Sequence, residues 1–186
     1  MTYEDIELAK GFSVRVCRRL LKDDDRATLA QFIVARFRER YFDPVINSSS
    51  KHGFTMAAIA CLAIESLAGF KQGLKETPQR QGKRTFVDFF EQALRPQLRE
   101  IRGNDFYKHI RCAVLHQAET TGGWRILRRG GLADYDAKTI NSALLIDELL
   151  LEVQEYAEHL KQDDAQWDCF RRKLEFVIDG CRDDAE

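Results

Sequence analysis

The sequence predicts an all-α fold, a compact bundle of five to seven helices with a short irregular loop or hairpin inserted late in the chain. Apolar side chains recur at steps of three and four residues over most of its length, which is the spacing of one helix face. Only 3 of the 186 residues are proline, and 44% are hydrophobic against 32% charged, as in globular proteins. Since no internal repeat or Gly/Ser linker divides the chain, we expect one domain over residues 1–186, with its helical core at about residues 50–160.

The first half of the chain predicts three helices. An apolar stripe over residues 3–22 gives the first, which ends at "KDDD". The second covers residues 25–42 and ends where Asp43-Pro44 and "NSSS" form a break. Residues 54–74 combine small residues with Leu, Ile and Phe, so neighbouring helices can approach closely. We therefore expect the third to be the central helix.

The second half predicts further helices around an irregular insertion. Residues 85–102 form a helix that Pro96 kinks or interrupts, and Gly103-Asn104 ends it. Asp105 is placed to cap the next helix, residues 106–119. The following segment loses helical periodicity and predicts a loop or small hairpin with Gly130-Gly131 at its turn. Residues 139–161 form a helix that is apolar around much of its circumference, which suits both core and subunit interface. A final amphipathic helix carries the apolar residues Trp167, Phe170, Leu174 and Val177.

The net charge and the cysteine content argue against several classes of protein. A net charge of −1 argues against a protein that coats nucleic acid through bulk positive charge, so any such contact must be local. The 5 cysteines never form a Cys-x-x-Cys pair, and we expect them to be reduced thiols in a cytoplasmic protein. The start "MTYEDIELAK" does not resemble a signal peptide. The apolar run at residues 54–70 carries Glu65 and is short for a membrane span, so we expect a buried helix and no membrane partner.

The stretch "IRCAVLHQAETTGGWRI" places the candidate chemistry. Arg111 and His116 are five residues apart, which in an ideal helix means roughly 140° of rotation and about 7.5 Å of rise. They do not share one face, so a second subunit contributing the same helix across a two-fold axis would bring such groups together. Glu65 is the third candidate, because a carboxylate in this apolar run is costly to bury unpaired and Arg111 is a suitable partner.

The segment "RCAVLH" resembles the R-x4-6-H motif of the HEPN superfamily, helical domains found in toxin–antitoxin, phage-defence and CRISPR-associated ribonucleases. The resemblance implies a HEPN-like bundle that dimerises so that two motifs face one cleft and cut single-stranded RNA without a metal or cofactor. It implies a homodimer, a possible antitoxin or other regulatory protein, and Arg111 and His116 as catalytic residues. Glu65 corresponds to the polar or acidic residue that such domains often carry in an early helix.

These roles are chemically reasonable. A histidine near its free pKa of about 6.5 can take a proton from a ribose 2′-OH or donate one to the leaving 5′ oxygen. An arginine can hold the scissile phosphate and stabilise the charge that gathers on it. Cleavage would leave a cyclic 2′,3′-phosphate and would fail on DNA.

Two positions depart from the family pattern and keep other functions open. Cys112 follows the arginine where active members commonly have a polar residue, and Ala118 stands where adenylylated toxins have a tyrosine. The alternative function is a non-catalytic HEPN-like module that binds RNA, a nucleotide or a protein. A purely structural role for Arg111 and His116 at a helix interface also remains. His109, Cys112 and His116 fall on one helical stripe, which is compatible with zinc but equally with a core face.

The segment "GGWRILRRGG" directly follows the motif helix. It joins Trp124 to three arginines, Arg125, Arg128 and Arg129, which suits base stacking and phosphate contact, and Gln117 lies close before it. We therefore expect these five residues to bind substrate. The alternative is a surface hairpin in which Trp124 plugs the end of the bundle while the arginines stay exposed.

Overall fold

The computed structural model describes residues 2–50 and 52–183. It is mostly helical, with 67% of residues in helices and two small sheets, which confirms the predicted fold class. The helices are α1 (Val14–Lys22), α2 (Arg26–Phe37), α3 (Asp43–Ile46), α4 (Gly53–Gln72), α5 (Gly82–Glu91), α6 (Pro96–Arg99), α7 (Gly103–Asp105), α8 (Cys112–Gln117), α9 (Ser142–Leu160) and α10 (Asp164–Asp183). Two π-helical stretches, η2 (Arg38–Phe42) and η3 (Phe106–Arg111), join α2 to α3 and α7 to α8.

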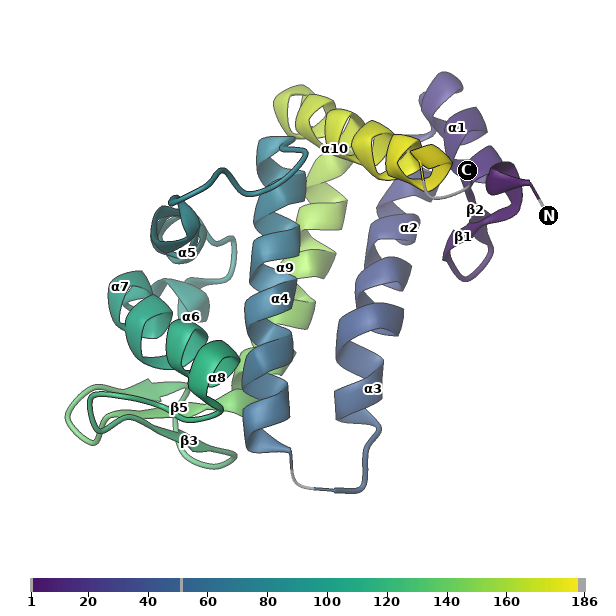
Figure 1. Cartoon of the computed structure of the whole chain (residues 1–186). Coiled ribbons are helices and arrows are strands. Elements are labelled where there is room, and N and C mark those ends of the chain that lie inside the picture. Colours follow the sequence, from purple (N-terminus) through teal and green to yellow (C-terminus); the bar gives the residue numbers. More distant parts are fainter. Residues whose placement is uncertain (1, 51, 184–186) are drawn as a thin grey trace.

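The long helices α4 and α9 form the centre of the molecule (Figure 1). Helix α9 packs against both α2 and α4, and α10 crosses one end of α4. Small residues on α4, including Ala57, Ala60 and Ala63, are buried and allow this close approach. The large buried side chains come mainly from these helices, among them Phe32, Phe70, Tyr156 and Phe170. The expectation that α4 is the central helix is confirmed.

Helix α4 is also long and apolar enough to cross a membrane by length and composition. The expectation that this run is too short was wrong, because the helix includes flanking residues and reaches from Gly53 to Gln72. However, 56% of its apolar window is buried inside the protein, against α5, α9 and α10. These contacts are those of a core helix.

The N-terminal segment differs from the single helix expected over residues 3–22. Residues Tyr3–Asp5 form a 3₁₀ turn (η1), and β1 (Glu7–Ala9) pairs antiparallel with β2 (Phe12–Ser13). Gly11 has φ +80°, which closes the tight turn between these strands. Ser13 then accepts a hydrogen bond from the Val16 N–H and caps α1, so helix begins only at Val14.

Two predicted helix breaks were also misplaced. Pro44 does not end the second helix, because it lies in the first turn of α3, where proline is tolerated, and η2 continues the helix into it. Gly103-Asn104 does not end a helix either: these residues begin α7, with Arg102 rather than Asp105 at the N-cap. Pro96 does interrupt the helical segment as expected, and it opens α6.

The insertion after the motif helix is a three-stranded sheet of order β3-β5-β4. Strand β3 (Arg125–Leu127) runs parallel to β5 (Thr139–Asn141), and β4 (Ala133–Asp134) pairs antiparallel with β5. The expected hairpin is therefore present, but it turns between β4 and β5 and not at Gly130-Gly131. Asn141 at the end of β5 accepts hydrogen bonds from the N–H groups of Ala143 and Leu144, and this cap starts α9.

Candidate functional site

The motif residues lie on one helix of mixed geometry. Helix α7 continues through η3 into α8, so Arg111 ends the π-helical stretch and His116 lies near the C-terminal end of α8. Single π turns within helices are frequent at functional sites. The beginning of this helix is fixed by close packing, because a Cβ at Gly103 would approach the Val87 Cα on α5 to 2.6 Å.

Glu65 on α4 and Arg111 form the ion pair expected from the sequence. The Arg111 Nε donates to the Glu65 Oε1 at 2.8 Å, and Nη2 lies 2.8 Å from the same oxygen. The two side chains are 21% and 25% exposed, so the pair lies at the surface rather than in the core. Burial disfavours the charge on Arg111, but the Glu65 carboxylate outweighs this effect and raises the pKa of the guanidinium.

The surroundings of Arg111 hold it in place. Its guanidinium lies over the ring of Tyr107, 5.6 Å from the ring centroid. Burial raises the pKa of the Tyr107 hydroxyl, so this group is a neutral neighbour at physiological pH. On α4, one turn before Glu65, burial raises the pKa of the Cys61 thiol to about 12, although the charge of Arg111 opposes this shift. The charge of the cluster therefore resides on Arg111 and Glu65.

His116 is solvent-exposed near the C-terminal end of α8. Among the described residues no hydrogen bond joins its side chain to that of Arg111, and His116 makes none at a helix interface. This agrees with the separation expected from five residues of helix. Gln117 is exposed beside it, and Ala118 ends α8 in the left-handed conformation at φ 52°. The Arg111 and His116 of one chain thus present two separate groups to solvent.

The segment after α8 divides into a buried tryptophan and exposed arginines. Trp124 is 8% exposed and packs edge-to-face on Tyr135, with ring centroids 5.5 Å apart. Its ring presents little surface on which a base could stack. The position of Trp124 therefore agrees with the alternative in which its side chain packs against the end of the bundle. Arg125, Arg128 and Arg129 are exposed, as both interpretations required.

The zinc alternative lacks a ligand cluster. Over residues 2–50 and 52–183, no three His, Cys, Asp or Glu side chains are grouped so that they could hold a metal ion. His109 instead bonds through Nδ1 to the Thr121 hydroxyl, 3.1 Å away, and its ring covers Gly122. A Cβ at Gly122 would lie 2.5 Å from that ring, and its φ of +66° independently favours glycine.

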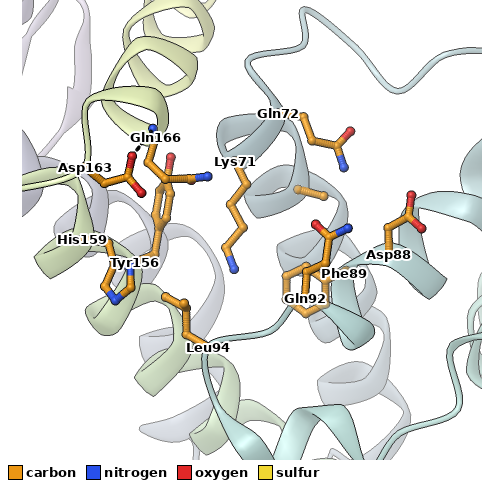
Figure 2. Close-up of a pocket in the computed structure, with 11 residues that line it drawn as sticks. Lys71, Gln72, Asp88, Phe89, Gln92, Leu94, Tyr156, His159, Asp163 and Gln166 are labelled. Atoms are coloured by element: carbon orange, nitrogen blue, oxygen red, sulfur yellow. Dashed lines mark hydrogen bonds between the residues drawn. The ribbon is translucent and has the colours of Figure 1, made fainter.

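The structure also contains a pocket of about 240 Å³ that sequence reasoning missed (Figure 2). It is lined by residues of α4, α5, α9 and the start of α10, including Lys71, Gln92 and Tyr156. Lys71 forms an ion pair with the fully buried Glu152, and among the described residues the buried Tyr156 hydroxyl has no hydrogen-bond partner. No sequence motif signals this pocket, because its residues come from four separate elements. None of the predicted site residues lines it.

Comparison with known proteins adds no relative to these observations. No family model, curated protein or solved structure gives a significant match to the chain.

Proposed function

We propose that the protein is a metal-independent endoribonuclease that cuts single-stranded RNA at a site formed by two copies of the chain. The observation that carries the proposal is the Glu65–Arg111 ion pair, which holds a guanidinium at the surface on the same helix as the exposed His116. This is the pair of groups that the resemblance to HEPN ribonucleases assigns to catalysis. The proposal extends to a cytoplasmic role in defence or stress, under the control of an antitoxin or another regulatory protein.

The proposed reaction is an internal transesterification. The His116 imidazole accepts the proton of the ribose 2′-OH, and the 2′ oxygen then attacks the adjacent phosphorus. The bond from phosphorus to the 5′ oxygen breaks, and that oxygen takes up a proton from the imidazolium of the partner copy. Arg111 binds a non-bridging oxygen and stabilises the negative charge of the transition state. The products are a 2′,3′-cyclic phosphate and a 5′-hydroxyl.

Glu65 is proposed as a positioning residue for Arg111. It occupies Nε and Nη2, and among the described residues Nη1 has no bond and stays available to a phosphate oxygen. A carboxylate in this place fixes the plane of the guanidinium and so directs Nη1 toward the phosphate.

The surface around the ion pair supports a second copy of the chain as the partner. Leu62 lies one turn before Glu65 on α4, and Leu115 lies one turn after Arg111 on α8, so all four residues share a surface. The two leucines are 44% and 36% exposed. Apolar side chains that flank an ion pair in this way are suited to burial across a two-fold axis, which would bring two copies of Arg111 and His116 together.

A second candidate is a module that binds RNA, a nucleotide or a protein without cleaving anything. The observation that favours it is the neutralisation of Arg111 by Glu65, followed by Cys112 where active enzymes of the resembled family commonly carry a polar group. An arginine whose charge is already compensated gains less from a phosphate.

The test is cleavage of an end-labelled single-stranded RNA in EDTA, with binding recorded on the same samples. We expect cutting by the wild type, and a loss of about 100-fold or more in His116→Ala and Arg111→Ala, the range typical of a lost acid–base or charge-stabilising group. Matched controls are His159→Ala, an exposed histidine near the far end of α9, and Arg15→Ala, an exposed arginine that is also ion-paired. Both should cut at the wild-type rate.

A substrate with one 2′-deoxyribose tests the chemistry independently of folding. The proposal requires that cutting stops at the substituted position and continues elsewhere. Cutting at that position, or equal loss in the control variants, would overturn it. Binding that is weakened by Arg111→Ala, with no cutting by any form, would support the binding module instead.

A further inference from the structure

A second cavity lies at the other end of the molecule, between β1, the C-terminal part of α2, η2 and α10. It has a volume of about 620 Å³ and is lined by four cationic side chains: Arg36, Arg40, Lys75 and Lys173. The opposing wall is partly apolar and includes Phe176 and Val177 of α10. In Figure 1, β1 and α10 lie at the upper right and α8 at the lower left. The cavity is thus separate from the Arg111–His116 surface, and its interpretation does not rest on the proposed function.

Arg36 is partly buried without a carboxylate partner. Its Nη1 donates to the carbonyl oxygen of Leu8 at 2.5 Å, and the Arg40 Nη2 donates to the same oxygen at 3.0 Å. A neutral carbonyl does not compensate two guanidinium charges. Burial and the neighbouring Arg40 accordingly lower the pKa of Arg36 to about 10.

Lys173 repeats this pattern on the α10 side. Its Nζ donates to the backbone carbonyl of Lys75 at 2.7 Å, and no carboxylate of the described residues lies within 4.0 Å of it. Burial and the charge of Arg36 lower its pKa, although Glu76 acts in the opposite direction. Two cations from different elements therefore repel each other across the cavity.

Two of the carboxylates near the cavity accept backbone hydrogen bonds elsewhere, and Glu76, which acts on Lys173, forms no salt bridge with it among the described residues. Glu7, the acidic residue of its lining, accepts a hydrogen bond from the Gly11 N–H, and Glu39 accepts one from the Lys10 N–H. Within residues 2–50 and 52–183, none of the four cations of the cavity forms a salt bridge. Other arginines of the chain, such as Arg18 and Arg95, do pair with carboxylates. The cavity therefore concentrates positive charge that an anion from outside would neutralise.

We propose that this cavity binds a small molecule that carries a phosphate or polyphosphate group. Arginine forks and lysine ammonium groups are the side chains that bind phosphate oxygens, and here they converge from three elements. The volume lies within the usual range for small-molecule sites, about 300–1,000 Å³. Phe176, which is 36% exposed, offers an apolar surface for the organic part of such a ligand.

Isothermal titration calorimetry on the intact chain tests the proposal, with inorganic pyrophosphate, ATP and adenosine as probes. We expect pyrophosphate and ATP to bind and adenosine not to bind. ATP that binds more than tenfold tighter than pyrophosphate would show contact with the organic part, and equal affinities would show recognition of phosphate alone. Both results support the site.

Charge-removing variants locate the binding. Lys173→Gln and Arg40→Gln should each weaken ATP binding at least tenfold, with melting temperatures near that of the wild type. Arg40 is exposed, which keeps the test valid if Lys173→Gln fails to fold. The matched control is Arg19→Gln, an exposed arginine of α1 outside the cavity lining, which should keep wild-type affinity.

Three results would overturn the proposal. The first is absence of pyrophosphate and ATP binding, and the second is equal weakening by Arg19→Gln. The third is loss of single-stranded RNA binding in the cavity variants while ATP fails to bind the wild type, because the cations would then serve a macromolecule.

Discussion

At the scale of single residues, Glu65 shows that the free-energy cost of burying an unpaired charge can be used to predict an ion pair from sequence. A carboxylate inside an apolar helical run requires a cationic partner, and the motif arginine Arg111, 46 positions away, was the suitable candidate that the structure pairs with it. For Trp124 the sequence left two interpretations open. An aromatic residue beside arginines suits a nucleic-acid surface and a hairpin plug equally, and only its contact with Tyr135 distinguishes the two.

Two buried thiols give a pH-dependent prediction. Burial raises the pKa of Cys17 and of Cys61 to about 12, above the value of about 8.5 expected in the unfolded chain. Between these values the unfolded chain binds fewer protons than the folded one, so the free energy of unfolding falls as the pH rises. Below about pH 8.5 the thiols have no such effect.

Urea unfolding at several pH values from 8 to 10.5 measures this effect. The double variant Cys17→Ala/Cys61→Ala should be less stable overall because of the cavities it creates, but its stability should decline less steeply with pH. Cys169→Ala, at a partly exposed position, should keep the wild-type slope. A double variant with an unchanged slope would contradict the prediction.

At the scale of elements, local signals located helices better than they located helix ends. The periodicities over residues 54–74 and 139–161 predicted α4 and α9 to within a few residues. The prediction of one helix over residues 3–22 was wrong because a short strand also places apolar residues a few positions apart. The positive φ of Gly11 then favours a hairpin turn over a helix. Pro44 failed as a break because it lies in the first turn of α3, where its missing N–H costs no helical hydrogen bond.

The connection between α5 and α6 depends on one buried carboxylate. Glu152 of α9 is 0% exposed, pairs with Lys71 of α4, and accepts the N–H groups of Leu94 and Arg95 at 3.0 and 2.8 Å. Glu152→Ala leaves the partly buried Lys71 ammonium and the two backbone N–H groups without this carboxylate, so we expect a loss of about 3 kcal/mol in the free energy of unfolding. Chemical denaturation measures this loss. Glu158→Ala, which breaks an exposed pair with Lys161, should cost less than about 1 kcal/mol. Similar losses in the two variants would refute the structural role of Glu152.

At the scale of the whole molecule, the proposed dimer depends on the surface formed by Leu62, Glu65, Arg111 and Leu115. Leu62→Arg replaces an apolar side chain of that surface with a charge and should shift the protein to monomer, while RNA cleavage falls with it. Ile46→Arg, a matched change at an exposed apolar residue of α3, should leave the dimer intact. Light scattering after size-exclusion chromatography gives the mass directly. A wild-type monomer that cuts RNA would exclude the composite site.

The sequence by itself determined the helical class and the central helix, which follow from local periodicity, and the need of Glu65 for a cationic partner, which follows from the cost of an unpaired buried charge. The tertiary structure decided the parallel pairing of β3 with β5, the burial of Trp124, and the cavities around Tyr156 and Arg36. The two cavities join residues that are distant in the chain, so their shape is set by how the helices pack. The strand pairing and the Trp124–Tyr135 contact lie within one insertion, but they depend on how its irregular segment folds back, which residue spacing does not show.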